Sequence, residues 1–188
     1  MGDSIILPAK KPTVWIFADA SLDTKTGIGG WGCHVKSVRS ATATVTGGTF
    51  EGPTQCPNAA ELKALAMACH IARAANMIEA GDHILLMSDS LVALMVLRRT
   101  LGANNLSTND GALVPVYGHK NKGSPIPPRF LGPANKMQGL IFSVGTVAVS
   151  VRHVTGHAQG GGSRQKISRR VDGIARASMK AARGKVVP

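Results

Sequence analysis

Acidic and aromatic residues are scarce in this sequence, and each scarcity bears on what the protein can bind. Only ten of its 188 residues are Asp or Glu, against 22 Lys and Arg, which gives a net charge of +12 and a pI near 10.3. This balance favours a polyanionic partner, because Lys and Arg that neutralise phosphates release condensed counterions. Anionic membranes, polyphosphates and a basic protein without such a partner are the alternatives. With 4% aromatic residues, base stacking is not expected to be the main source of affinity.

Cysteines and long apolar runs are also in short supply. Cys33, Cys56 and Cys69 are odd in number and lack a close-paired spacing, which argues against a disulfide framework and a zinc ribbon. No apolar run reaches the roughly 18 to 20 residues that span a bilayer, and the first residues lack the pattern of a secretory leader. We therefore expect a soluble, cytoplasmic protein that does not attach to membranes.

The length and the 44% hydrophobic content fit one domain over residues 1–188, with its core in about 13–183. Residues 102–133 are rich in Gly, Asn, Pro and Lys and are too long for an ordinary connection, so they are interpreted as a basic loop or insertion. Candidate phosphate contacts are Lys120, Lys122 and Arg129 in this segment, together with the arginines and lysines of the last predicted helix.

The first third of the chain predicts three strands. Residues 14–18 form an apolar, β-rich run typical of a buried strand, and Asp19 is expected to end it. Glycines then precede a second strand at 31–36, and Thr alternates with small residues over a third strand at 41–50. We expect these three strands to form an antiparallel meander.

Helices alternate with strands in the rest of the chain. A fourth strand is expected at 83–87 and a fifth at 146–154. A helix between the meander and the fourth strand favours a parallel, right-handed connection, which makes the sheet mixed. Apolar spacing predicts helices at 59–79, 90–101, 135–144 and 165–182.

Four acidic residues lie in local sequences suited to one carboxylate cluster: Asp19, Glu61, Asp89 and Asp172. Asp19 and Asp89 each follow a buried strand. Because sites in open α/β sheets lie beyond the carboxyl ends of the strands, these two carboxylates are expected to face one gap. In-line hydrolysis of a phosphodiester needs charge relief on both sides of the phosphorus, which two ions about 3.5 to 4 Å apart supply. Mg²⁺ prefers such hard oxygen ligands.

Each acidic residue also has an ordinary structural explanation. Asp89 could cap the helix that follows it, and Asp19 could stabilise a turn. Asn58-x-x-Glu61 is close to a capping box, with Asn58 as the N-cap. Asp172 could simply pair with an arginine of its own helix. For any one residue taken alone, the structural explanation is the stronger.

Taken together, the motifs resemble ribonuclease H of type 1. The resemblance covers about residues 14–179, and the order and spacing of its motifs are more specific than any one of them. The matching stretches are Asp19-x-Ser21 with its glycine-rich hairpin, Asn58-x-x-Glu61, Asp89-Ser90, Thr155-Gly156-His157 and Val171-Asp172-Gly173-Ile174-Ala175.

This resemblance implies an α/β fold in which a five-stranded mixed sheet, in the order 3-2-1-4-5, is flanked by helices. It implies an endoribonuclease that cuts the RNA strand of an RNA/DNA hybrid and leaves a 3′-hydroxyl and a 5′-phosphate. Two Mg²⁺ ions, or Mn²⁺, would be held by Asp19, Glu61, Asp89 and Asp172. His157 would assist proton transfer or product release. We also expect a monomer that binds metal weakly without its substrate.

The resemblance further implies that Asn58 contacts the minor groove of the hybrid, where 2′-hydroxyls distinguish RNA from DNA. The interval from His157 to Asp172 is longer than is usual in the family, and no helical counterpart of the basic protrusion of some members is evident. Two alternatives remain open. One is a DNA-directed nuclease of the same fold, such as a junction resolvase or transposase core, and the other is a basic nucleic-acid-binding module without cleavage.

Overall fold

A mixed β-sheet lies at the centre of this computed structural model, which describes residues 11–54, 56–101, 106–107, 125–145, 147–154 and 162–185. Its strands follow the order β3-β2-β1-β4-β6-β5. Their bounds are β1 (Val14–Leu22), β2 (Gly29–Ser37), β3 (Thr44–Thr49), β4 (His83–Ser88), β5 (Leu106–Ser107) and β6 (Ala148–His153).

The strand directions match those expected from the sequence. β1, β2 and β3 form an antiparallel meander, β4 runs parallel to β1, and β6 runs parallel to β4. The predicted order 3-2-1-4-5 is therefore confirmed as β3-β2-β1-β4-β6. The two-residue strand β5 comes from the segment predicted as a loop and adds an edge beside β6.

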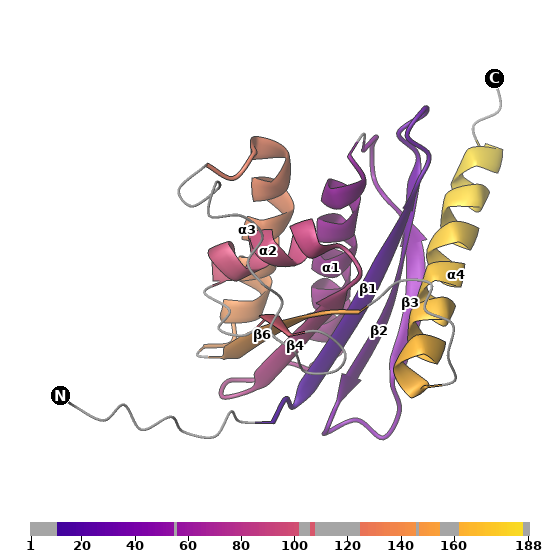
Figure 1. Cartoon of the computed structure of the whole chain (residues 1–188). Helices are drawn as coiled ribbons and strands as arrows, with labels where there is room; N and C mark the ends of the chain where they lie inside the picture. The colour runs from indigo at the N-terminus through magenta and orange to yellow at the C-terminus, as the bar shows by residue number, and fades with distance from the viewer. Residues whose placement is uncertain are drawn as a thin grey trace.

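Helices cover both faces of the sheet. Figure 1 shows α4 on one face and α1, α2 and α3 on the other. Within the described part of the chain, no helix is long and apolar enough to cross a membrane. The helix bounds are α1 (Pro57–Ala74), α2 (Leu91–Leu101), α3 (Pro128–Phe142) and α4 (Ser163–Lys185).

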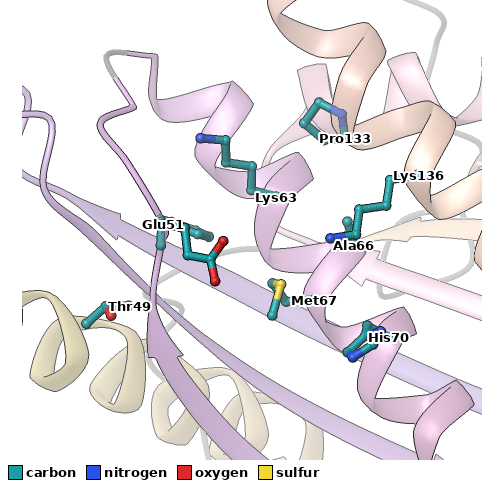
Figure 2. A pocket seen from close by; sticks show the side chains of 9 residues that line it. Thr49, Glu51, Lys63, Ala66, Met67, His70, Pro133 and Lys136 are labelled. Atoms are coloured by element: carbon teal, nitrogen blue, oxygen red, sulfur yellow. The ribbon is translucent and has the colours of Figure 1, made fainter.

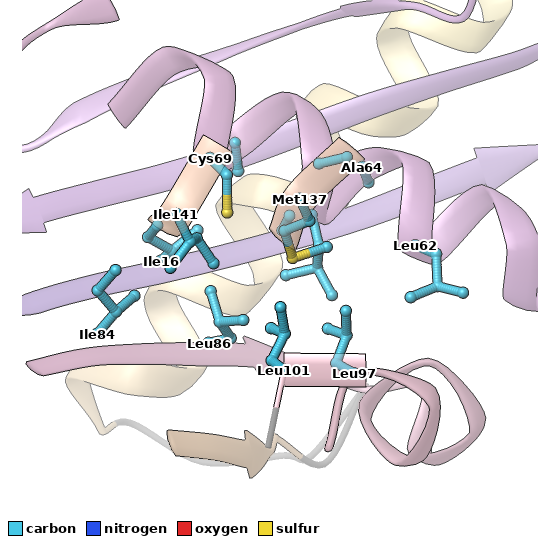
Figure 3. Close-up of a cluster of buried hydrophobic side chains, with 14 of the residues drawn as sticks. Ile16, Leu62, Ala64, Cys69, Ile84, Leu86, Leu97, Leu101, Met137 and Ile141 are labelled. Carbon is cyan, nitrogen blue, oxygen red and sulfur yellow. The ribbon is translucent and has the colours of Figure 1, made fainter. Parts of the chain in front are cut away.

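The main hydrophobic core fills the space between the sheet and the three helices α1, α2 and α3 (Figure 3). Val14, Ile16 and Ala18 of β1 belong to this core, whereas Phe17 packs on the opposite face with Val171 of α4. This alternation is the period-two pattern of a strand buried on both faces. It places Asp19, two residues after Phe17, on the side of α4.

Two helix boundaries differ from those predicted. The first helix ends at Ala74 instead of residue 79, because Asn76 adopts a positive φ of 52° that an α-helix cannot continue through. The third helix begins at Pro128 instead of residue 135. Pro occupies its first turn, where the missing N–H costs no hydrogen bond. Residues 128–133 of the predicted loop therefore belong to α3, while 102–105 and 108–124 lie outside the described residues.

Asp82, just before β4, ties together three segments away from the acidic cluster. Its carboxylate accepts hydrogen bonds from Thr13 Oγ1 (2.7 Å), from the Arg39 guanidinium (2.9 and 2.6 Å) and from the Glu79 backbone N–H (2.8 Å). The side chain is only 4% exposed. The hydrogen bond with Arg39 is the main cause that lowers the pKa of Asp82 from 3.8 to about 2.

Replacing Asp82 with Asn is expected to lower the free energy of unfolding by about 3 kcal/mol, because it removes the buried carboxylate from its ion pair with the Arg39 guanidinium. Since the folded-state pKa of Asp82 is depressed, the stability that its carboxylate contributes is present above pH 4 and is lost as the pH falls from about 4 to about 2. Urea unfolding at pH 7 and pH 3 measures both effects. The exposed Glu51→Gln variant is the control, and equal stability of the two variants at pH 7 would contradict the assignment.

Candidate metal centre

β1 extends beyond the end of β4. This offset leaves the last residues of β1 unpaired on the β4 side, which forms an open edge there. Pairing between the two strands stops at Phe17↔Met87, while β1 continues to Leu22 beside β2. Asp19 lies inside this extension. The prediction that Asp19 ends the strand was wrong, because the glycine-rich start of β2 keeps pairing with β1 as far as Leu22↔Gly29.

Three of the four predicted acidic residues meet at this edge. Asp19 comes from β1, Glu61 from α1, and Asp89 from the turn between β4 and α2. One carboxylate oxygen of each lies within 4.8 Å of the others. Asp19 is 8% exposed, so its carboxylate is buried rather than solvated. Asp19 and Asp89 therefore face one gap, as the ends of their strands indicated.

Glu61 is held in this position by both of its oxygens. Oε1 accepts a hydrogen bond from the Ala20 backbone N–H (3.2 Å), and Oε2 accepts one from the Ser88 hydroxyl (3.3 Å). Ala20 lies past the end of β4, so its N–H is available to a side chain instead of a neighbouring strand. The sequence analysis missed Ser88, although its position as a polar residue between an apolar run and Asp89 could have indicated a role in the site.

The turn that carries Asp89 is fixed by its neighbours. The hydroxyl of Ser90 accepts the Ala93 backbone N–H (3.2 Å), so Ser90 and not Asp89 caps α2. The Ser88 hydroxyl accepts the Ser90 N–H (3.1 Å), and the His153 Nε2 atom lies 2.9 Å from the Asp89 carbonyl oxygen. His153 was the second residue that the sequence analysis missed, and it connects the end of β6 to this turn.

Asn58 does not cap α1, which corrects the capping-box interpretation. The cap position is Cys56, which makes no side-chain hydrogen bond, and Pro57 follows as the first helical residue. Instead, the Asn58 Oδ1 atom accepts a hydrogen bond from the Ser90 hydroxyl at 3.0 Å. This contact links the first turn of α1 to the start of α2, next to Asp89.

Asp172 lies beside the group of three. Its Oδ1 atom forms an ion pair with Arg176 Nε at 2.8 Å, the same-helix pair considered from the sequence. Its negative charge also contributes to raising the pKa of Asp19, which places the two carboxylates close enough to interact. Asp172 therefore lies on α4, across the sheet from the helix that carries Glu61 (Figure 1), and is paired with a cation of its own helix.

Burial and mutual repulsion make the cluster electrostatically unfavourable by itself. Burial, followed by the charges of Asp89 and Asp172, raises the pKa of Asp19 from 3.8 to about 7. Burial and the charges of Asp19 and Asp89 raise the pKa of Glu61 from 4.5 to about 9. A divalent cation would relieve this repulsion, and carboxylate oxygens are the donors that Mg²⁺ and Mn²⁺ prefer. The donor set therefore fits a hard divalent metal.

Several predicted site residues lie elsewhere. His157, Lys120 and Lys122 fall outside the described residues. Arg129 is exposed near the start of α3, and its guanidinium lies 5.0 Å from the centre of the Phe130 ring.

A separate hollow of about 430 Å³ lies between the end of β3 and the helices α1 and α3 (Figure 2). None of Asp19, Glu61 and Asp89 is among the described residues that line it. Its lining residues are Thr49, Phe50, Glu51, Lys63, Ala66, Met67, His70, Pro133 and Lys136. The carboxylate cluster and the hollow are therefore distinct features.

Comparison by sequence finds no relative of this chain. No protein-family model matches it, and no curated protein matches it.

Comparison by structure finds many proteins with the same fold. RNase H1 from the halophilic archaeon Halobacterium salinarum superposes with a TM-score of 0.58 at 18% identity, covering 89% of this chain and 98% of that one. The N-terminal RNase H domain of a Mycobacterium tuberculosis protein gives 0.60 at 17% identity, covering 94% and 100%. LC11-RNase H1 in complex with an RNA/DNA hybrid gives 0.59 at 16% identity, covering 90% and 98%. The fold is therefore ribonuclease H-like.

Proposed function

We propose that this protein is a metal-dependent endoribonuclease that hydrolyses the RNA strand of RNA/DNA hybrids. The observation that carries the proposal is the convergence of Asp19, Glu61 and Asp89 from three separate elements to within 4.8 Å, at the open edge of a ribonuclease H-like sheet. The net charge of +12 supports a phosphate-bearing substrate. We also propose that the chain acts as a monomer with one domain.

Asp19, Glu61, Asp89 and Asp172 would hold two Mg²⁺ or Mn²⁺ ions, which supply an activated water and stabilise the leaving oxygen during in-line displacement. Asp19 and Glu61 release the protons that their raised pKa values retain in the free protein. The hydrogen bonds from Ala20 and Ser88 fix both oxygens of Glu61 before metal binds. Asp172 would give up its ion pair with Arg176 to serve as a metal ligand. The products would carry a 3′-hydroxyl and a 5′-phosphate.

Asn58 would distinguish RNA from DNA. Its Oδ1 atom is engaged by the Ser90 hydroxyl, so its amide group is the donor that it can offer to a 2′-hydroxyl. His157 would assist proton transfer or product release. Arg129, Lys120 and Lys122 would contact phosphates, which positions a duplex without reading its sequence.

The test is a cleavage assay with four labelled substrates: an RNA/DNA hybrid, duplex RNA, duplex DNA and a four-way junction. We expect the hybrid alone to be cut, with Mg²⁺ or Mn²⁺ and not in EDTA, and the RNA fragments to end in 3′-hydroxyls. Cleavage of DNA or of the junction would replace the proposal with a DNA-directed nuclease. Binding without cleavage of any substrate in either metal would reduce the protein to a nucleic-acid-binding module.

A further inference from the structure

The outer surface of α4 is strongly basic and is not part of the carboxylate cluster. Of the 23 residues in α4, only Asp172 is acidic. Among the side chains of α4 that the structure describes, the exposed basic ones are Lys166, Arg169, Arg170, Arg176, Lys180 and Arg183. We call these six residues the α4 basic face.

Helical spacing aligns three of the six residues of the α4 basic face into one stripe. Lys166, Arg170 and Lys180 are separated by four and ten residues, so together with the exposed Gly173 and Ala177 they follow the i, i+4, i+7, i+11, i+14 row of an α-helix. From Lys166 to Lys180 the row extends about 21 Å at 1.5 Å per residue. All five residues of the row are exposed, and α4 itself lies against one face of the sheet (Figure 1).

Packing does not account for these charges. The apolar side of α4 is used against the sheet, where Val171 and Ala175 are fully buried. Among the described residues, Lys166, Arg170 and Lys180 form no ion pair, whereas Arg176 pairs with Asp172 and Arg183 with Asp23. Lys166 and Arg170 are four residues apart on the helix and repel one another, so a ligand of opposite charge is favoured at this surface.

The geometry points to the phosphate backbone of a nucleic acid duplex as the ligand of the α4 basic face. A duplex carries one negative charge per about 1.7 Å of its axis, so a straight row of this length meets several phosphates. The exposed large hydrophobic residues of the described chain are Val38, Val92, Leu131 and Phe142, and none of them lies on α4. The helix therefore lacks the aromatic or aliphatic groups with which an interfacial helix enters a membrane.

This surface is an anchoring site separate from the cleavage site. Contacts with phosphates do not depend on the sugar, so the α4 basic face binds duplex DNA as well as the hybrid and needs no metal. The inference adds to the proposed function but does not require cleavage to occur.

The experiment compares two triple variants that remove the same number of charges. One carries Lys166→Gln, Arg170→Gln and Lys180→Gln, and the control carries Lys11→Gln, Lys25→Gln and Lys136→Gln, three exposed lysines on other segments. Binding of a labelled 30-base-pair duplex DNA and of the matching hybrid is measured in EDTA, over a range of salt concentrations. Because no metal is present, the result is independent of cleavage.

We expect the α4 variant to lose at least about tenfold in affinity for both duplexes at low salt, and the slope of log K against log salt to decrease in magnitude by about 3, one per lost phosphate contact. The control variant should keep the wild-type slope. Equal losses in the two variants would show that only the overall charge matters, and would overturn the proposal. A second result would also overturn the proposal: wild-type protein binds vesicles of phosphatidylserine and phosphatidylcholine through the same three residues but binds neither duplex.

Discussion

Replacing Asp19 with Asn is expected to reduce cleavage of the hybrid by about a thousandfold or more. Asp19 is a buried member of the cluster with Glu61 and Asp89, and the charge of Asp172 also acts on its carboxylate. Loss of one carboxylate ligand withdraws several kcal/mol of stabilisation from the developing charges, and each 1.36 kcal/mol corresponds to a factor of ten in rate. Single-turnover cleavage of a labelled hybrid in Mg²⁺ measures the effect.

Asp23→Asn is the matched control, because Asp23 lies four residues further along and pairs with Arg183 outside the cluster. It should cleave at the wild-type rate. Hybrid binding in EDTA should be similar for the two variants, since neither residue is expected to contact phosphate directly. Wild-type activity of Asp19→Asn would remove Asp19 from the site.

The Asp19→Asn variant should also be more stable than the wild type in metal-free buffer. The raised pKa of Asp19, about 7, means that between pH 4 and pH 7 the folded protein holds a proton that the unfolded chain has released. Stability of the wild type therefore falls as the pH rises through this range, and Asn avoids the cost. We expect Asp19→Asn to gain about 2 kcal/mol at pH 8. Thermal unfolding with and without Mg²⁺ checks this, since metal should stabilise the wild type more.

The sheet was the most predictable part of the molecule. β-rich runs at regular spacing, a glycine-rich hairpin and a helical crossover specify the direction of each strand, and the directions hold for all five predicted strands. The local patterns were sufficient because burial on both faces leaves few alternative registers for β1 and β4. The end of β1 was missed because it depends on pairing with β2 and not on the composition of β1.

Helix boundaries were less predictable where proline and glycine rules were applied without tertiary context. Pro133 was assigned to a loop, yet it lies inside α3. The helix continues through it because Phe130, Ala134, Met137 and Ile141 form one buried face, which outweighs the hydrogen bond that Pro133 cannot donate. Sequence rules for proline cannot predict this outcome, because it depends on the surface of α1 against which α3 packs.

The candidate site was predicted as a set of residues but not as a network. Sequence motifs identified the acidic residues, since their order and spacing are local facts. The hydrogen bonds from Ser88 to Glu61 and from Ser90 to Asn58 join residues 27 and 32 positions apart, so no local pattern could reveal them. The ion pair between Asp172 and Arg176 was foreseeable from its i, i+4 spacing, whereas the proximity of Asp172 to Asp19 was expected only from the set of motifs and not from any local pattern.

That proximity depends on Gly32, which is the Cα partner of Asp19 on β2. A Cβ atom added at Gly32 would lie 2.4 Å from the Val171 carbonyl oxygen and 3.2 Å from the Ala175 backbone nitrogen. The absence of a side chain therefore lets the backbone of α4 lie directly on the sheet. Because Asp172 follows Val171, this close approach is what brings its carboxylate near Asp19.

Gly32→Ala is accordingly expected to displace α4, to lower the free energy of unfolding by about 3 kcal/mol and to slow cleavage at least tenfold, although Gly32 would touch neither metal nor substrate. Gly173→Ala is the control, because its Cβ meets nothing within 4 Å and alanine in an exposed helix should add about 1 kcal/mol of stability. Urea unfolding and hybrid cleavage by the folded variants measure both effects. A folded Gly32→Ala protein with wild-type stability and cleavage would contradict this expectation. It would show that α4 can shift without moving Asp172, so that contact with Gly32 does not set the position of the fourth carboxylate.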